Sequence, residues 1–157
     1  MKIGIIYATT HGCTEKCVLK VKTGLSEEIE SFNIKKNPKP QIDGYDTILI
    51  GGSIHAGRIQ NSIQKFCKKH LDALLKKKIG LFICCMEKGK KAEEQLINAF
   101  PLELLDHAKA KGYFGGAFDF DRMNFIEKAI IKKVANIDQS ISNISEESIQ
   151  NFITEIQ

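Results

Sequence analysis

The sequence predicts a three-layer α/β fold, in which a doubly wound, five-stranded parallel sheet carries helices on both faces. Short and almost wholly apolar segments alternate with longer segments whose apolar residues recur every three or four positions. The apolar segments have the composition of strands that are buried on both faces, as parallel strands are. The 157 residues are enough for one domain with a sizeable core, so we expect a single domain over residues 1–157.

The first half of the chain supplies three of the five expected strands. Lys2–Tyr7 is the first, and a helix begins near Cys13. A short edge strand is expected at 31–36, before the break made by Asn37-Pro38-Lys39-Pro40. The next strand covers 45–50 and is closed by Gly51-Gly52-Ser53. The first helix carries its apolar stripe on Cys17, Val18, Val21, Leu25 and Ile29.

The second half continues the alternation. We expect Asn61 to cap a helix, with Gln64 three residues later in the capping-box position. Strands follow at 79–86 and 113–120, and helices at 90–100, 102–108 and 123–137. Residues 140–145 read as a linker, and Ser145 is expected to cap the last helix. The helix at 123–137 is expected to bury one face, made of Phe125, Ile126, Ala129, Ile130, Val134 and Ile137.

Charge is distributed unevenly along the chain, whose net charge is +4. Residues 58–91 hold one Arg and nine Lys against two acids, whereas from Val134 onward there are acids but no Lys or Arg. The basic region has two interpretations, a solvated helix face or a surface that meets an anionic partner or membrane peripherally. We expect no nucleic-acid partner.

No apolar run approaches the length of about 20 residues that spans a membrane, and no signal peptide precedes the first strand. A cytoplasmic location is therefore expected, with peripheral contact to the inner face of the membrane as an extension of it. The five cysteines are odd in number and lie in apolar or helical contexts, which indicates reduced thiols. Cys13 and Cys17 have no matching Cys or His pair, so the sequence does not predict a metal site.

The segment from Tyr7 to Thr14 joins the first strand to the first helix, and it has the composition of an anion site. The first N–H groups of a helix have no partner within the helix and carry partial positive charge. Gly12 permits close approach of a ligand, and the threonines offer hydroxyl donors. No Lys or Arg lies in the segment, so a P-loop is excluded and a phosphate held by neutral donors is expected. An ordinary strand–helix loop with a threonine cap is the alternative.

In doubly wound sheets, ligands bind beyond the carboxyl ends of the strands. In this chain those ends lead into residues 8–14, 52–60, 86–90 and 119–122. We therefore expect these four segments to form one site.

Two stretches resemble a known family. Thr9-Thr10-His11-Gly12-Cys13-Thr14 resembles the phosphate loop of flavodoxins, with His11 where a threonine is usual. The strand that ends in Gly51-Gly52-Ser53-Ile54-His55-Ala56-Gly57 resembles the flavodoxin-like branch that contains menaquinone-dependent protoporphyrinogen oxidase. Gly115-Gly116-Ala117 and the helix after it also fit that branch, so the resemblance covers most of the chain.

The resemblance implies FMN as the cofactor. It places the phosphate among Thr9, Thr10, His11, Gly12, Cys13 and Thr14, and one side of the isoalloxazine against Ser53, Ile54, His55, Ala56 and Gly57. Met86, Glu87 and Lys88 would line the other side. Gly57 is expected to approach the flavin N5, and His55 is the candidate catalytic residue, as a proton relay or a stabiliser of reduced flavin. Simple packing within its loop is the alternative for His55.

The chain departs from the flavodoxin pattern in two ways. It has no Trp, and neither ring-binding segment holds Tyr or Phe, whereas electron-shuttle flavodoxins stack such rings on the flavin. It is also basic where those proteins are acidic. Both departures favour an oxidoreductase of the quinone-linked protoporphyrinogen oxidase type, with a quinone, a porphyrin or a redox protein as donor or acceptor. The alternatives are a soluble electron-transfer protein, a flavin-free binding protein that uses the same fold, or a phosphatase-like protein in which Cys13 acts as a nucleophile.

Overall fold

The computed structural model describes residues 1–118, 124–135 and 141–157, and its centre is a sheet of five parallel strands. Their order is β2-β1-β3-β5-β6, which confirms the predicted doubly wound α/β class. The short strand β4 pairs antiparallel with the end of β3. The bounds are β1 Lys2–Tyr7, β2 Glu28–Asn33, β3 Thr47–His55, β4 Arg58–Ile59, β5 Lys78–Cys84 and β6 Ala110–Tyr113.

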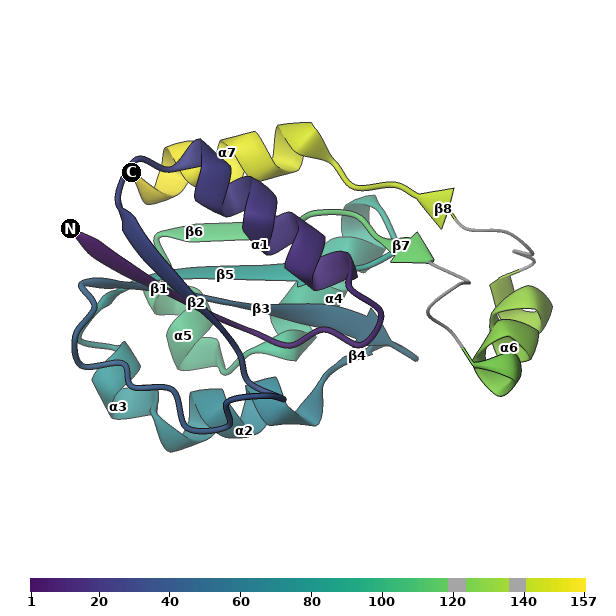
Figure 1. Ribbon diagram of the computed structural model, residues 1–157, viewed down its shortest axis with the longest axis horizontal. Helices are drawn as coiled ribbons and strands as arrows, with labels where there is room; N and C mark the ends of the chain where they lie inside the picture. The colour runs from purple at the N-terminus through teal and green to yellow at the C-terminus, as the bar shows by residue number, and fades with distance from the viewer. Residues whose placement is uncertain (119–123, 136–140) are drawn as a thin grey trace.

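Helices cover both faces of this sheet (Figure 1). One layer consists of α1 (Cys13–Gly24) and α7 (Glu146–Ile156). The other layer consists of α2 (Asn61–Lys69), α3 (Leu71–Leu74), α4 (Gly89–Ala99) and α5 (Leu102–His107). Each layer closes its own apolar cluster against the sheet, because the parallel strands are apolar on both faces. The three layers confirm the predicted architecture.

The cluster beneath α1 and α7 is built around three phenylalanine rings. Phe82 stacks on Phe114 with ring centroids 4.9 Å apart, and Phe152 from α7 meets both rings edge-on. Helix α7 begins as predicted, because the Ser145 hydroxyl accepts a hydrogen bond from the Ser148 N–H at 3.1 Å. An ion pair between Lys20 and Glu146 adds a contact between α1 and α7.

Several predicted boundaries were wrong. Helix α1 ends at Gly24, so Ile29 lies in β2 rather than on the helical stripe. Strand β3 continues through the two glycines to His55, because the neighbouring strand β5 pairs with Gly51, Gly52 and Ser53. Asn61 is the first residue of α2 and not its cap; Gln60 holds the cap position, without a side-chain capping bond.

The strand predicted at 113–120 is two separate strands. β6 ends at Tyr113, and β7 (Ala117–Phe118) pairs antiparallel with β8 (Ile141–Ser142) in a second small sheet. Gly115 makes the turn between them with φ of 81°, and a Cβ there would lie 1.9 Å from the Asn143 carbonyl oxygen. Its carbonyl accepts the Cys85 N–H at 2.9 Å. Residues 119 and 120 lie outside the described residues.

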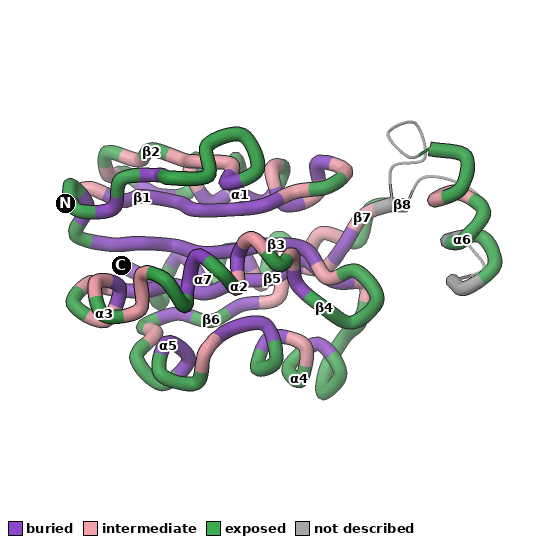
Figure 2. The backbone as a smooth tube through the Cα atoms, turned by 90° about the horizontal axis from the view of Figure 1, so that it is seen from below, coloured by how far each residue is buried: buried purple, intermediate pink, exposed green. Residues whose placement is uncertain are grey.

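Helix α6 (Phe125–Ala135) does not bury the apolar face that its sequence predicts. The exposed fractions of Phe125, Ile126 and Ile130 are 87%, 68% and 54%. Figure 2 shows the helix standing apart from the sheet, beyond the carboxyl ends of the strands. Residues 123 and 137, and the Val134 side chain, lie outside the description. Among residues 1–118, 124–135 and 141–157, no helix is long and apolar enough to cross a membrane.

Candidate functional site

A cavity of about 350 Å³ lies at the carboxyl ends of β1, β3 and β5, where the sequence places the site. Three of the four expected segments contribute to its wall, and the fourth, 119–122, lies outside the described residues. The wall is mostly apolar. It is formed by Thr9, Thr10, His11, Cys13, Ser53, Ile54, His55, Ala56, Cys84, Cys85, Met86, Gly116, Ala117, Glu127 and Ile130.

The loop after β1 forms a cradle at the start of α1. Gly12 adopts a left-handed conformation with φ of 89°, and its N–H donates to the Thr9 hydroxyl at 2.9 Å. This turn directs the first N–H groups of α1, which have no partner within the helix, toward the loop. Thr14 is fully buried, and within the described chain its hydroxyl oxygen has no hydrogen-bond partner. A buried, unsatisfied hydroxyl at a helix start suits an anionic ligand.

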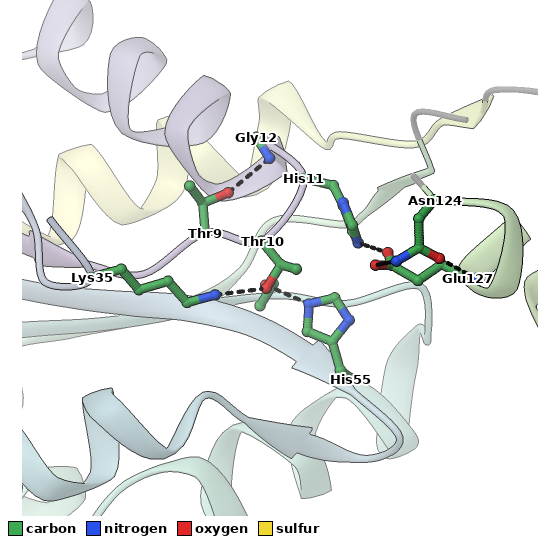
Figure 3. A network of polar contacts seen from close by, with 9 residues as sticks. Thr9, Thr10, His11, Gly12, Lys35, His55, Asn124 and Glu127 are labelled. Atoms are coloured by element: carbon green, nitrogen blue, oxygen red, sulfur yellow. Dashed lines mark hydrogen bonds and ion pairs between the residues drawn. The ribbon is translucent and has the colours of Figure 1, made fainter. Parts of the chain in front are cut away.

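A cation also reaches this loop from elsewhere in the sequence. The Lys35 ammonium donates to the Thr10 hydroxyl at 3.3 Å. Lys35 follows β2, and its approach is a consequence of parallel pairing, because β2 and β1 end side by side (Figure 3). The loop itself holds no Lys or Arg, as the sequence shows, but inspection of residues 7–14 could not reveal a lysine that lies 25 positions away from Thr10.

The β3–β4 hairpin holds the opposite wall through three linked side chains. Gln60 accepts from the Ser53 N–H at 2.9 Å and donates to the Ser53 hydroxyl at 2.6 Å. The Ser53 hydroxyl lies 3.0 Å from Nε2 of His55. The contacts of Ser53 with Gln60 and with His55 therefore tie the imidazole ring to the hairpin. Desolvation and the nearby His11 lower the pKa of His55, so the neutral form is favoured at neutral pH.

The hairpin turn consists of Ala56 and Gly57, both with positive φ (49° and 77°), as in tight two-residue hairpins. Ala56 lines the cavity. Gly57 is exposed, does not line the cavity, and would have no neighbour within 4 Å of an added Cβ. It is therefore Ala56, rather than Gly57, that the hairpin brings to the cavity wall.

An ion pair joins the loop after β1 to α6. Nε2 of His11 lies 2.5 Å from a carboxylate oxygen of Glu127. The other oxygen of Glu127 accepts from the Asn124 amide at 2.8 Å, and the Glu127 N–H donates back to Asn124 at 2.8 Å. Figure 3 shows His11 directed at this pair. The Asn124 side chain therefore caps the start of α6, which the Asn three residues before Glu127 in the sequence could have revealed.

The cavity floor carries a cysteine at the N-terminus of α1. The pKa of Cys13 is well below that of a free thiol, because its sulfur accepts hydrogen bonds from the thiols of Cys17 and Cys84. The N–H of Ala117 and the charge of Lys16 act in the same direction. A thiolate is therefore favoured at this position at neutral pH.

The structure brings together most of the residues that the sequence selects. Gly12 and Thr14 shape the cradle behind the wall without lining the cavity, and Glu87 and Lys88 are exposed and also do not line it. Sequence reasoning missed Cys84, Cys85, Gly116, Ala117, Glu127 and Ile130, which line the cavity. Cys84 and Cys85 carry no polar motif, and a residue at the end of a buried strand looks like an ordinary core residue.

Comparison with known protein families gives a match over most of the chain. The profile of the family described as "Flavodoxin domain" matches residues 4–144. Protoporphyrinogen IX dehydrogenase [quinone] from Escherichia coli strain K12 is 31% identical to this chain over 77 residues. That match covers 47% of this chain and 42% of the E. coli protein, so the aligned region spans less than half the length of the relative.

Solved structures share the fold at lower identity. A Fusobacterium nucleatum flavodoxin bound to flavin mononucleotide matches with a TM-score of 0.58 and 19% identity, over 99% of this chain and 96% of that one. A flavodoxin, WrbA-like protein from Agrobacterium tumefaciens matches with a TM-score of 0.54 and 15% identity, over 99% and 92%. Rubredoxin oxygen:oxidoreductase from Desulfovibrio gigas matches with a TM-score of 0.55 and 11% identity, over 99% of this chain and 34% of that one.

Proposed function

Because this chain belongs to the flavodoxin domain family, we propose that it binds FMN at the carboxyl ends of β1, β3 and β5 and acts as an oxidoreductase linked to a quinone. The observation that carries the proposal is the buried hydroxyl of Thr14, which within the described chain lacks a partner. It lies in the first turn of α1, next to the glycine turn that opens the helix start. A phosphate in this cradle gives the hydroxyl and the free N–H groups their missing acceptor.

The remaining phosphate contacts come from the same loop and from Lys35. The hydroxyls of Thr9 and Thr10 face the turn, and the Lys35 ammonium already contacts Thr10. One exposed cation balances part of a phosphate dianion, while backbone and hydroxyl donors fix its position. We therefore assign the phosphate to the hydroxyls of Thr9, Thr10 and Thr14 and to the backbone N–H groups of Gly12 and Cys13. Lys35 is the residue that the sequence did not predict.

The apolar part of the cavity fits the ring system. Ile54, Met86 and Ile130 line it, and none of the described residues on its wall is Trp, Tyr or Phe. FMN supplies one-electron and two-electron redox chemistry when bound, and the protein tunes it by hydrogen bonds and nearby charge. Without an aromatic ring stacked on it, one face of the cofactor is left more accessible to a flat second substrate such as a quinone.

His55 is the proposed proton-handling residue. Its Nε2 lies 3.0 Å from the Ser53 hydroxyl, which fixes the orientation of the ring. The lowered pKa keeps the ring neutral at neutral pH, and a neutral imidazole can take up a proton when negative charge develops beside it. Gln60 positions Ser53 and through it the ring.

A quinone-linked oxidoreductase is preferred to a plain electron carrier for two reasons. The similar E. coli protein is named as a quinone-linked dehydrogenase. Residues 58–91 of this chain are rich in lysine. A basic surface favours anionic porphyrin carboxylates or an anionic membrane surface as partners. The alternative is an electron-transfer protein without its own substrate, and the similarity of fold to the F. nucleatum flavodoxin is what supports it.

Two measurements test the proposal in sequence. Titration of the purified chain with FMN should quench flavin fluorescence with one FMN per chain, and the complex should show a flavin absorption spectrum. The loaded protein should then oxidise protoporphyrinogen and reduce a menaquinone analogue in steady state. Failure to bind FMN would overturn the whole proposal. FMN binding with electron transfer only to a redox protein would overturn the quinone-linked part and support the alternative.

A further inference from the structure

Three cysteine sulfurs meet at the floor of the cavity, from segments far apart in the sequence. Cys13 and Cys17 lie one turn apart on α1, and Cys84 is the last residue of β5. The three sulfurs all lie within 4.8 Å of one another, and those of Cys17 and Cys84 are 3.5 Å apart. We propose that these three cysteines form a binding site for a soft, thiophilic metal ion, with Cu(I) as the preferred occupant.

The separation of the sulfurs suits a single ion. Three sulfurs placed about 2.3 Å from a central ion in a plane lie about 4 Å from one another. The observed upper limit of 4.8 Å leaves only small side-chain rotations to reach that arrangement. Each thiol that coordinates the ion releases its proton to solvent, so binding requires no oxidant or reductant.

The chemistry of the group selects the metal. The donors are sulfur only, which excludes the oxygen-preferring ions magnesium and calcium. Zinc takes four ligands, so a zinc ion bound by these three sulfurs needs a water molecule as its fourth ligand. Cu(I) is soft and favours thiolate ligands, and three-sulfur coordination leaves it fully ligated in an apolar setting. The surrounding core cluster, which includes Ile5, Val21 and Phe114, supplies that setting.

An entry path and an outer contact are both present. Cys17 and Cys84 are 0% and 2% exposed, but Cys13 is partly exposed and lines the cavity. An ion can therefore enter through the cavity and pass to the two buried sulfurs. The N–H of Ala117 donates to the Cys13 sulfur, and such outer contacts orient a ligand and stabilise its charge.

The site has a consequence for the phosphate cradle. Three thiolates around a monovalent cation leave two negative charges at the N-terminus of α1, beside the loop proposed to hold phosphate. Metal and FMN phosphate should therefore oppose each other's binding. This consequence rests on the proposed function, whereas the metal site itself does not.

The test is an anaerobic titration of the reduced chain with Cu(I), in competition with a chromophoric Cu(I) chelator. We expect one tightly bound ion per chain, and X-ray absorption should show three sulfur neighbours at about 2.3 Å. Changes in outer contacts of metal sites weaken binding 10- to 100-fold, so Cys17→Ala and Cys84→Ala should each weaken it about 100-fold or more.

Cys67→Ala and Cys85→Ala are the matched controls. Cys67 is buried in the other core cluster, and Cys85 lines the same cavity without joining the three sulfurs. Both variants should bind Cu(I) as the parent does. Cys13→Ser changes a partly exposed position and keeps the test informative if a buried variant fails to fold; far-UV circular dichroism checks each fold.

Equal loss of affinity in the Cys67 or Cys85 variants, or full affinity in the folded Cys13→Ser variant, would overturn the site. Addition of FMN should then weaken Cu(I) binding. A chain that binds Cu(I) but not FMN contradicts the proposed function and leaves the metal site standing. A chain that binds FMN but not Cu(I) contradicts the metal site and leaves the proposed function standing.

Discussion

Gln60 contacts Ser53 through both atoms of its side-chain amide: Oε1 accepts from the Ser53 N–H at 2.9 Å, and Nε2 donates to the Ser53 hydroxyl at 2.6 Å. This pair of bonds closes the β3–β4 hairpin across the turn at Ala56 and Gly57. The Ser53 hydroxyl in turn lies 3.0 Å from Nε2 of His55. One residue therefore supports both the hairpin and, through Ser53, the position of the histidine ring.

Replacement of Gln60 by Ala removes both bonds and leaves the Ser53 N–H, in a residue only 8% exposed, without a partner. An unsatisfied buried donor costs about 1–3 kcal/mol, so the free energy of unfolding in urea should fall by that amount. Gln64→Ala, four residues along the same chain segment, should change it by less than about 0.5 kcal/mol. Equal free energies of unfolding for the two variants would show that the Gln60 contact does not stabilise the fold.

Replacement of Thr14 by Val separates binding from folding. The variant keeps the shape of the side chain and removes a buried hydroxyl that, in the described chain, has no partner. The ligand-free protein should therefore be unchanged or more stable by up to about 1 kcal/mol, while its affinity for FMN should fall. Thr23→Val, at an exposed hydroxyl that donates to the Lys20 carbonyl, is the control and should leave FMN affinity intact.

Replacement of Ala56 by Gly relieves a left-handed backbone that disfavours a Cβ. A left-handed backbone costs a non-glycine residue about 1–2 kcal/mol, so glycine removes that strain from the folded state. Glycine also gives the unfolded chain more conformational entropy, which offsets part of the stabilisation. The midpoint of thermal unfolding should therefore rise by a few degrees. A fall in the midpoint would mean that contacts of the Ala56 methyl group outweigh the backbone strain.

Alkaline pH should destabilise the protein through Cys67. Burial raises the pKa of Cys67 to about 12, whereas the unfolded chain ionises this thiol in the ordinary range near 9. The folded state therefore retains a proton that the unfolded state loses, so stability falls as pH rises from about 9 to about 12. Urea unfolding under reducing conditions measures this slope.

The Cys67→Ala variant should show a shallower slope than the parent over that window. Ile63→Val truncates a neighbouring buried side chain that does not ionise. It should lower the unfolding free energy by about 0.5–1.5 kcal/mol at every pH and keep the parental slope. Parallel curves for the parent and Cys67→Ala would contradict the assignment.

Patterns local to a strand or helix predicted the fold well. The apolar runs at β1 and β5 and the serine cap of α7 depend on neighbouring residues in the sequence, and the structure keeps them. The order of elements then dictated a parallel sheet with its ligand site at the carboxyl ends. The cavity lies there because topology alone brings those ends together.

Features that depend on tertiary contact could not be predicted in this way. The strand expected at 113–120 divides at Gly115 because the chain must turn to meet Cys85 and Asn143. Lys35 and Cys84 reach the site across large separations in sequence, which no local pattern encodes. The apolar face of α6 reads as a core face, yet Phe125 and Ile126 are exposed in the structure.

The phenylalanine cluster beneath α7 bears on the order in which the chain acquires its structure during synthesis. Phe82 and Phe114 lie against Phe152 of α7. The ribosome synthesises Phe152 only after all strands of the parallel sheet. The layer of α2 to α5 has its own cluster and can close earlier. Nascent chains that end before α7 should therefore expose the part of this face that α7 covers, around Phe82 and Phe114, to chaperones, although α1 and the helices of the other layer are already in place.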